Sequence, residues 1–344
     1  MNGCKRILSI ILMSVILTGC SQRFSEIMLI ENEPSEEQEH MFLSVFGYKA
    51  DALNLIAIEK ILNRFMEENP DIIVNYEGVK GIEYWKAFER RAEANVLDDV
   101  FMVDHDRVIN MADKGKLADL SSLSTIENYQ DRMKEQFISE DGSVYFLPTC
   151  ISFYGLYINY SLLEAHGQKV PENWSDFMEV CDYFAAKGIT PVIANNYASL
   201  RKLIAAKSLY SVYQQDTASA IKEFNREPAK LANTLRPGIE MVEEMIERKW
   251  IDCAEVLETE QTSDDLKLFV GGNRPFMVTG GWAAIRVKNM EPDFSYGVHA
   301  FPILDDGSVL VVEGNTCISV NAGSEHLEEV MRLVECITQP DSIW

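Results

Sequence analysis

Basic residues are scarce in this chain of 344 residues, in which 31 Lys and Arg face 54 Asp and Glu and give a formal net charge of −23. A nucleic-acid-binding protein needs a basic surface to neutralise phosphates, so this charge excludes a general nucleic-acid partner. An anionic lipid surface would repel the chain as well, and membrane attachment therefore needs a separate cause. The apolar content of 47% excludes a mainly disordered chain. A chain of this length is expected to form about two domains.

Catalytic and metal-binding signatures are also missing. The sequence contains no GxSxG, HExxH, Walker A or GxGxxG motif, and its five histidines are scattered. Asp104-His105-Asp106 has the character of a metal ligand set, but no further ligands cluster beside it. The sequence therefore predicts no enzyme, no cofactor and no metal site. Its many acidic pairs leave a glycosidase-like pair of carboxylates as an alternative.

Cysteine spacing gives little sign of a disulfide framework. After Cys20, five cysteines remain, an odd number, and none of them forms a CxxC pair. Buried free thiols are the favoured interpretation, and one disulfide stays open as an alternative. These residues are Cys150, Cys181, Cys253, Cys317 and Cys336.

Long apolar runs are absent except at the N-terminus. Lys5 and Arg6 precede the apolar run Leu8–Leu17, which ends in Leu17-Thr18-Gly19-Cys20. This pattern predicts an export signal over residues 1–19, because the run is too short for a good membrane span. The last four residues resemble the bacterial lipoprotein box, which implies cleavage before Cys20 and lipid attachment to its thiol. An uncleaved anchor helix with an incidental cysteine is the alternative.

Behind the signal, residues 20–40 are rich in Glu and predict a solvated acidic tether. From residue 41 onward, apolar strand segments alternate with helices that have one apolar face. This alternation predicts an α/β fold with mostly parallel sheets. Asn173 is expected to cap a helix with Asp176 in the reciprocal position, and Pro237-Gly238 to break or begin one. A hairpin is expected between residues 296–301 and 309–312.

Four stretches of the sequence carry a family resemblance. They resemble the patterns FxxxNPxI, dGkvYglP followed by glyYN, PxTWdEF followed by kGitP, and AMxxxGxW. They lie at residues 65–72, 141–148 with 155–159, 171–177 with 187–191, and 275–282. Because all four stretches occur in this order, the chain resembles the sugar-binding extracellular solute-binding proteins of ABC importers (family 1, the maltose-binding-like group). Asn173 replaces the usual Thr, and Pro275-Phe276 replaces Ala-Met.

The resemblance implies a two-lobed periplasmic-binding-protein fold of type II, with a hinge and a ligand cleft between the lobes. We assign residues 41–147 and 276–322 to lobe one, and residues 148–275 and 323–344 to lobe two. Crossings are then expected near Pro148, Pro275 and Asn321. Family members continue through further C-terminal helices, so lobe two is expected to lack part of its wall.

Candidate binding residues follow from two rules. Aromatic faces stack on the apolar side of a sugar ring, and polar side chains bond its hydroxyls. In open α/β sheets such groups lie on loops at the carboxyl ends of strands. The strand ends and the resemblance together select Tyr48, Asp106, Arg107, Ser152, Tyr154, Asn195, Asn196, Trp282 and Glu313. The alternative at each position is core packing, helix capping or turn chemistry.

The resemblance further implies a membrane-anchored protein that captures a sugar or oligosaccharide and delivers it to an ABC importer. Its expected partners are a carbohydrate ligand and the permease subunits. It is expected to be a monomer, held by lipid at the extracytoplasmic face of the cell membrane. The alternatives are a lipoprotein with a sensory or vestigial role, or a binder of a non-sugar polar solute such as a peptide or a metal.

Overall fold

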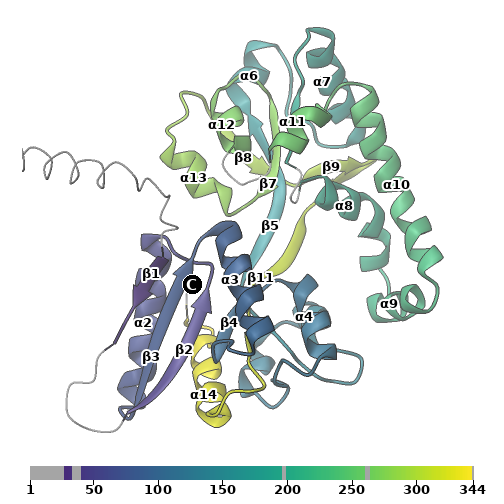
Figure 1. The fold of residues 1–344 in the computed structure, drawn as a ribbon. Coiled ribbons are helices and arrows are strands. Elements are labelled where there is room, and N and C mark those ends of the chain that lie inside the picture. The colour runs from purple at the N-terminus through teal and green to yellow at the C-terminus, as the bar shows by residue number, and fades with distance from the viewer. Residues whose placement is uncertain (1–26, 33–39, 196–198, 260–263, 343–344) are drawn as a thin grey trace, which may run out of the picture. The chain divides into compact units, whose positions relative to one another are not determined.

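The computed structural model describes residues 27–32, 40–195, 199–259 and 264–342 (Figure 1). The predicted signal peptide and Cys20 lie outside the described residues. The chain divides into two compact units, and the second unit comprises Ile151–Asn315. The first unit comprises the segments on either side, up to Cys150 and from Thr316 onward. The chain passes between the units twice, within strands β5 (Leu147–Asn159) and β11 (Val311–Val320).

The first unit is built on a mixed sheet with the strand order β1-β3-β2-β4-β11 (Figure 1). Strand β2 pairs in parallel with β3 and β4, whereas β1 and β11 pair antiparallel with their neighbours. The strands are β1 (Ile27–Ile30), β2 (Met41–Gly47), β3 (Ile72–Val79) and β4 (Val100–Val103). All four residues of β4 are buried, as expected for a strand that is covered on both faces.

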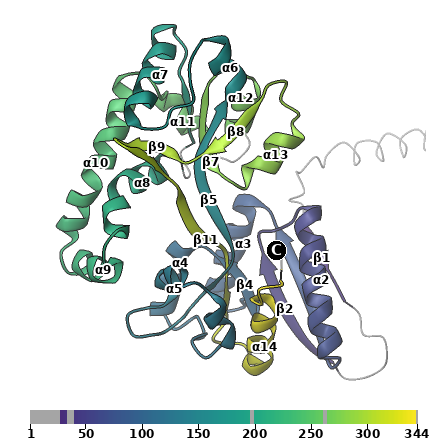
Figure 2. The same cartoon turned by 180° about the vertical axis from the view of Figure 1, so that it is seen from behind.

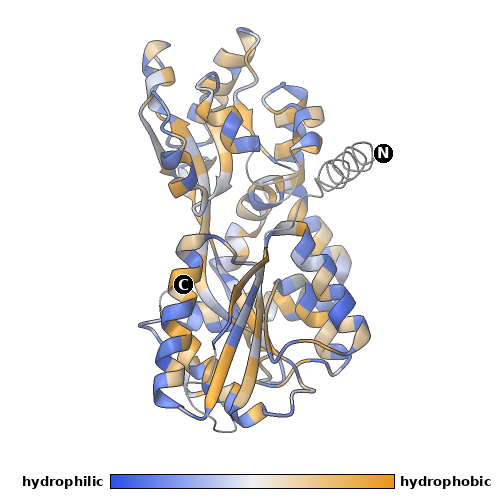
Figure 3. Cartoon of the chain, turned by 60° about the vertical axis from the view of Figure 1, so that its left-hand side comes forward, coloured by the Kyte–Doolittle hydropathy of each residue, from blue (hydrophilic) through white to orange (hydrophobic). Residues whose placement is uncertain are grey.

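Helices pack on this sheet because each carries an apolar face. In Figure 3 the strands of the first unit are largely orange, whereas blue and orange alternate along its helices. The helices are α2 (Ala52–Glu68), α3 (Gly81–Ala94), α4 (His105–Asp113), α5 (Asp131–Phe137) and α14 (Leu327–Ile337), with a 3₁₀ turn at Ser124–Asn128. Helix α14 contacts α2 and buries Leu333 and Val334 in the core of this unit (Figure 2).

The second unit has its own core, and its strands β5, β6, β7 and β8 pair with one another. Strand β5 pairs antiparallel with β7 and β8, and β6 pairs in parallel with β7. The strands are β6 (Val192–Ile193), β7 (Phe276–Gly280) and β8 (Tyr296–His299), with a separate pair of β9 (Phe301–Leu304) and β10 (Gly307–Val309). The core of this unit is centred on Trp250, Phe184 and Phe276, all fully buried.

The described part of the second unit contains eight helices. They are α6 (Tyr160–Ala165), α7 (Trp174–Ala186), α8 (Ser199–Tyr213), α9 (Thr217–Arg226), α10 (Pro228–Glu247), α11 (Cys253–Glu258), α12 (Asp264–Val270) and α13 (Ala283–Asn289). Helix α10 continues through Pro237 and Gly238, where the sequence predicted a break or a first turn. The Ser208 hydroxyl of α8 accepts from the Gly238 N–H at 2.8 Å and donates to the Leu235 carbonyl at 2.9 Å. These bonds satisfy backbone groups near the proline.

The division of the chain differs from the one expected. Residues 276–315 belong to the second unit, because β7 pairs between β5 and β6 and buries Phe276 and Val278 in that core. The segment from residue 323 belongs to the first unit, where α14 packs. The boundary at Cys150 lies two residues from the crossing expected at Pro148, but Pro275 is not a crossing.

Three local expectations also need correction. Residues 27–30 of the supposed tether form strand β1, which pairs with β3 from Ile27↔Val79 to Ile30↔Tyr76. Residues 296–299 pair with β5, and the hairpin is formed by β9 and β10 instead. All five cysteines after Cys20 are free, as expected, but Cys253 is exposed and Cys150 is only half-buried.

Candidate functional site

Strand β5 presents two different faces as it enters the second unit. Ser152 and Tyr154 are buried, with exposed fractions of 8% and 5%, whereas Ile151 and Phe153 are exposed at 64% and 40%. Side chains alternate across a strand, so the two pairs point to opposite faces. One face therefore offers polar groups held within the unit, and the other offers an open apolar surface.

The buried face carries two sets of side-chain contacts. Asn315 of β11 donates its side-chain amide to the Ser152 hydroxyl at 2.7 Å. Lys202 of α8 forms an ion pair with Glu313, and its ammonium lies 4.7 Å from the centre of the Tyr154 ring. We call Ser152, Tyr154, Lys202, Glu313 and Asn315 the polar network. It unites three of the residues expected from the sequence: Ser152, Tyr154 and Glu313.

The exposed face is completed by the turn between β7 and α13. The Gly281 N–H donates to the Phe153 carbonyl at 2.7 Å, which fixes this turn against β5. A Cβ atom at Gly281 would lie 2.3 Å from the Phe153 ring, and one at Gly280 would lie 2.1 Å from Nε1 of Trp282. The two glycines are therefore needed for the close approach of both aromatic rings.

Trp282 itself is half-buried at the start of α13. It packs against a small buried cluster that includes Phe269 and Val287, and the Arg286 guanidinium lies 5.2 Å from its ring centre. The ring is neither enclosed in the core nor fully solvated. The half-exposed indole and the exposed Phe153 ring each offer a face on which the apolar side of a ring can stack. We call Phe153 and Trp282 the aromatic pair.

Asn195 has an internal role in this structure. It is 3% exposed, donates its amide to Asp265 at 2.8 Å and accepts from the Ser199 N–H at 3.3 Å. Asp265 is fully buried, and burial raises its pKa, although the bonds from Asn195 and from the Leu266 N–H act in the opposite direction. Asn195 therefore holds the start of α8 to α12 and does not face outward. Asn196 lies outside the described residues.

The first unit gathers a second set of expected residues around Trp85 of α3. The Tyr48 ring lies 6.0 Å from the Trp85 ring, and the Arg107 guanidinium lies 4.2 Å from the ring centre. Arg107 also pairs with Glu89 at 2.8 Å. Asp106 lies in the first turn of α4, and its side chain is outside the described part.

Tyr48 is held as a neutral phenol. Burial and the nearby Asp104 carboxylate raise its pKa well above the usual value, while a hydrogen bond from Thr316 acts in the opposite direction. Its ring also packs edge-on against Tyr84 at 5.4 Å. A neutral, half-buried phenol can both donate and accept a hydrogen bond, which suits a hydroxyl-rich partner.

Sequence reasoning missed Lys202 and Phe153. Phe153 stands between two expected residues, and the alternation of a strand gives a signal that its ring faces the other way. Lys202 lies on a long helical segment far from the others in sequence, and no spacing pointed to it. Across the described residues, no group of three or more His, Cys, Asp or Glu side chains could hold a metal ion. In the described part of the chain, no helix is both long enough and apolar enough to cross a bilayer.

The chain thus consists of two α/β units that are joined through β5 and β11, an architecture found in solved binding proteins. The solved apo structure of RafE from Streptococcus pneumoniae superposes with a TM-score of 0.64 and 21% identity, covering 89% of this chain and 79% of RafE. At this identity the likeness shows the fold, and it confirms the expected two-lobed α/β architecture.

The family follows from the sequence itself. Residues 60–343 match the model described as bacterial extracellular solute-binding protein, and the chain belongs to that family. The multiple sugar-binding protein of Streptococcus mutans is 23% identical over 95% of this chain and 76% of its own length. The maltodextrin-binding protein MdxE of Bacillus subtilis is 24% identical over 73% of this chain, and the match spans 58% of MdxE.

Proposed function

We propose that the protein captures a sugar or oligosaccharide and delivers it to an ABC importer. The observation that carries this proposal is the exposed Phe153 ring of β5, together with the half-buried Trp282 ring at the start of α13. Phe153 and Trp282 supply stacking surfaces for a pyranose ring. The names of the Streptococcus and Bacillus relatives support a carbohydrate ligand over other polar solutes.

In this proposal Glu313 and Lys202 bind hydroxyls of a different part of the ligand from the ring that stacks on the aromatic pair, because the two sets lie on opposite faces of β5. The Glu313 carboxylate accepts from a hydroxyl, while Lys202 balances its charge and donates. Hydrogen bonds to charged groups contribute about 1.5–3 kcal/mol each, so a few of them orient a sugar once water is displaced. Ser152 and Asn315 act mainly on each other and hold β5 and β11 in register.

The other residues selected from the sequence are assigned roles in ligand binding as well. Tyr48, Asp106 and Arg107 of the first unit are proposed ligand contacts, as is Asn196. Asn195 is proposed only as a positioning residue, because its amide is used within the unit. Cleavage before Cys20 and lipidation of its thiol would hold a monomer at the extracytoplasmic face of the membrane.

The proposal is tested by calorimetric titration of the purified full chain with maltotriose, maltose and raffinose. Glycine and glycerol are the matched non-sugar controls. At least one sugar should give a saturable heat that neither control gives. If a chain with an intact thermal transition gives no saturable heat with any sugar, the proposal is wrong.

Two further measurements separate the alternatives. Release of new reducing ends from maltotriose would indicate an enzyme, whereas a binding protein leaves the sugar unchanged. Co-purification with permease subunits from membranes supports delivery to an importer. Sugar binding without any permease partner would favour a sensory role.

A further inference from the structure

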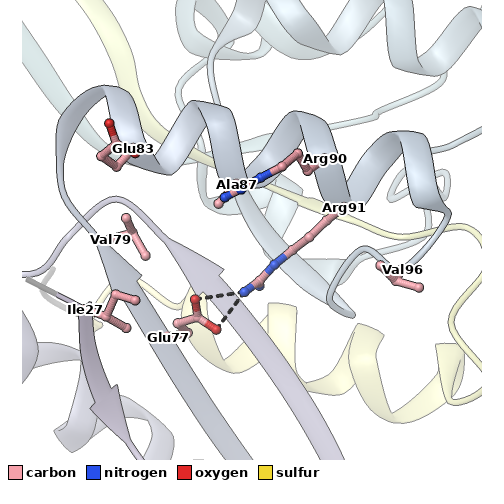
Figure 4. A pocket seen from close by; sticks show the side chains of 8 residues that line it. All are labelled: Ile27, Glu77, Val79, Glu83, Ala87, Arg90, Arg91 and Val96. Atoms are coloured by element: carbon pink, nitrogen blue, oxygen red, sulfur yellow. Dashed lines mark hydrogen bonds and ion pairs between the residues drawn. The ribbon is translucent and has the colours of Figure 1, made fainter. Parts of the chain in front are cut away.

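A groove on the first unit lies apart from the residues discussed so far. It has a volume of about 430 Å³ and lies between helix α3 and the strands β1 and β3 (Figure 4). Ligand pockets in proteins have volumes of roughly 300–1,000 Å³, so the groove is large enough for a small molecule. None of its lining residues belongs to the aromatic pair or the polar network.

The floor and one wall of the groove are apolar. Ile27 pairs directly with Val79 across β1 and β3, and both side chains line the groove together with Val96. Val79 is buried, but Ile27 and Val96 are exposed at 53% and 65%. Ala87 of α3 adds a small side chain that leaves the groove open. Exposed aliphatic groups that converge on one groove favour an aliphatic occupant.

Most charges around the groove are already paired with each other. The Arg91 guanidinium donates to both Glu77 oxygens at 2.8 and 2.7 Å, as the dashed lines in Figure 4 show, and it donates to Asp98 at 2.6 Å. Glu83 pairs with Lys86 at 2.7 Å. Arg90 differs, because no ion pair joins it to any residue of the described ranges. Among the described residues, Arg90 is therefore the lining cation whose charge no ion pair balances, and it can meet an anion.

We infer that this groove binds a small amphiphile with an aliphatic chain and a single anionic head group, such as a medium-chain carboxylate. The chain lies against Ile27, Val79 and Val96, and the head group meets Arg90. A second copy of the protein fits less well, because each copy carries a net charge of −23 and like charges repel. An anionic bilayer surface is disfavoured for the same reason.

The test uses the full chain in zwitterionic phosphatidylcholine vesicles and a diazirine-bearing analogue of decanoate. After irradiation, mass spectrometry maps the labelled peptides. Label should fall on the peptides that contain Ile27 or the segment from Ala87 to Val96. Excess decanoate should displace it more effectively than excess decanol, which has the same chain without the charge.

Two variants and a control sharpen the test. Arg90→Gln should weaken displacement by decanoate up to about fivefold, the usual range for one exposed ion pair. Ala87→Leu should reduce labelling by narrowing the groove while Arg90 is kept. Arg226→Gln removes an exposed arginine from α9 and should leave labelling unchanged. An unchanged thermal transition confirms that each variant is folded.

Several outcomes would overturn the inference. Label spread over the chain, or equal displacement by decanol and decanoate, would show unspecific partition. Label that appears only in phosphatidylglycerol vesicles would assign this face to a bilayer surface. Label lost on cross-linking into dimers would assign it to a second copy. None of these outcomes depends on whether the protein binds a sugar.

Discussion

At the scale of single residues, close packing of small and aromatic side chains shapes the candidate site. Gly281 lies against the ring of Phe153, which leaves no room for a Cβ atom. Both the position of Phe153 and the start of α13 therefore depend on a residue without a side chain. The contact can be tested by adding a single methyl group.

Gly281→Ala is predicted to destabilise the protein by about 1–3 kcal/mol, because the added methyl would lie 2.3 Å from the Phe153 ring. Chemical denaturation monitored by circular dichroism measures the change. Gly307→Ala is the matched control, since a Cβ atom there meets nothing within 4 Å. Equal stability of the two variants would show that Phe153 moves away freely.

Asp265 gives a prediction about pH. Burial raises the pKa of the Asp265 carboxyl in the folded protein above its value in the unfolded chain. Protonated Asp265 therefore stabilises the fold fully at a pH below the unfolded pKa of about 3.9. This stabilisation is lost as the pH rises through the folded pKa. The destabilisation caused by Asp265→Asn should therefore be largest in acid and smaller at neutral pH. Urea titrations at acid and neutral pH, with the exposed Asp305→Asn as control, measure how the loss in free energy of unfolding depends on pH. A cost that grows toward neutral pH would contradict this account.

Residue-scale prediction from the sequence succeeded where local chemistry decides. The buried free thiols expected from the cysteine spacing are confirmed at Cys181, Cys317 and Cys336. Asn195 was expected to face a ligand, but its amide is bonded inside the unit. The position at a strand end correctly brings the Asn195 amide to an edge of the sheet. The residue that accepts a hydrogen bond from this amide is Asp265, which lies 70 residues further along the chain.

At the scale of elements, caps and turns were readable from sequence. The Asn173 side chain accepts from the Asp176 N–H at 3.0 Å, as expected for the cap of α7. The reciprocal bond is displaced by one residue, since Asp176 accepts from the Glu172 N–H at 3.2 Å. Strand pairing was less readable, because the partner of β8 is β5, more than a hundred residues away in the chain.

Asn173→Ala is predicted to cost about 0.5–2 kcal/mol of stability, because an N–H in the first turn of α7 loses its acceptor. Asn173→Asp keeps an acceptor and should be close to neutral. Urea unfolding of both variants measures the difference. Similar losses for Ala and Asp would mean that the cap is not the source of the effect.

At the scale of the whole molecule, acidic charge is the dominant property. A net charge of −23 makes the folded chain repel itself, and dissolved salt screens this repulsion. The thermal midpoint should therefore rise between about 10 mM and 150 mM NaCl. Calorimetric scans measure the shift, and KCl should give the same rise. A midpoint that falls with salt would show that favourable ion pairs outweigh the repulsion.

The fold class was predictable at this scale, but the division of the chain was not. Alternating strands and helices, with four family-like stretches, indicated a two-unit α/β fold. Placing residues 276–315 required knowing that β7 lies between β5 and β6. That order is set by burial of Phe276 and Val278 in one core, which is a long-range choice that local sequence does not record.

The most direct test of the whole account is the affinity of Trp282→Ala for whichever sugar the wild-type chain binds. Stacking on the aromatic pair predicts a loss of about 1–3 kcal/mol, or roughly 5- to 150-fold in the dissociation constant. Trp174→Phe, a change in a tryptophan that packs against Trp250, should leave the affinity unchanged. If Trp282→Ala binds the sugar as tightly as the wild-type chain, the aromatic pair is not the sugar-binding surface.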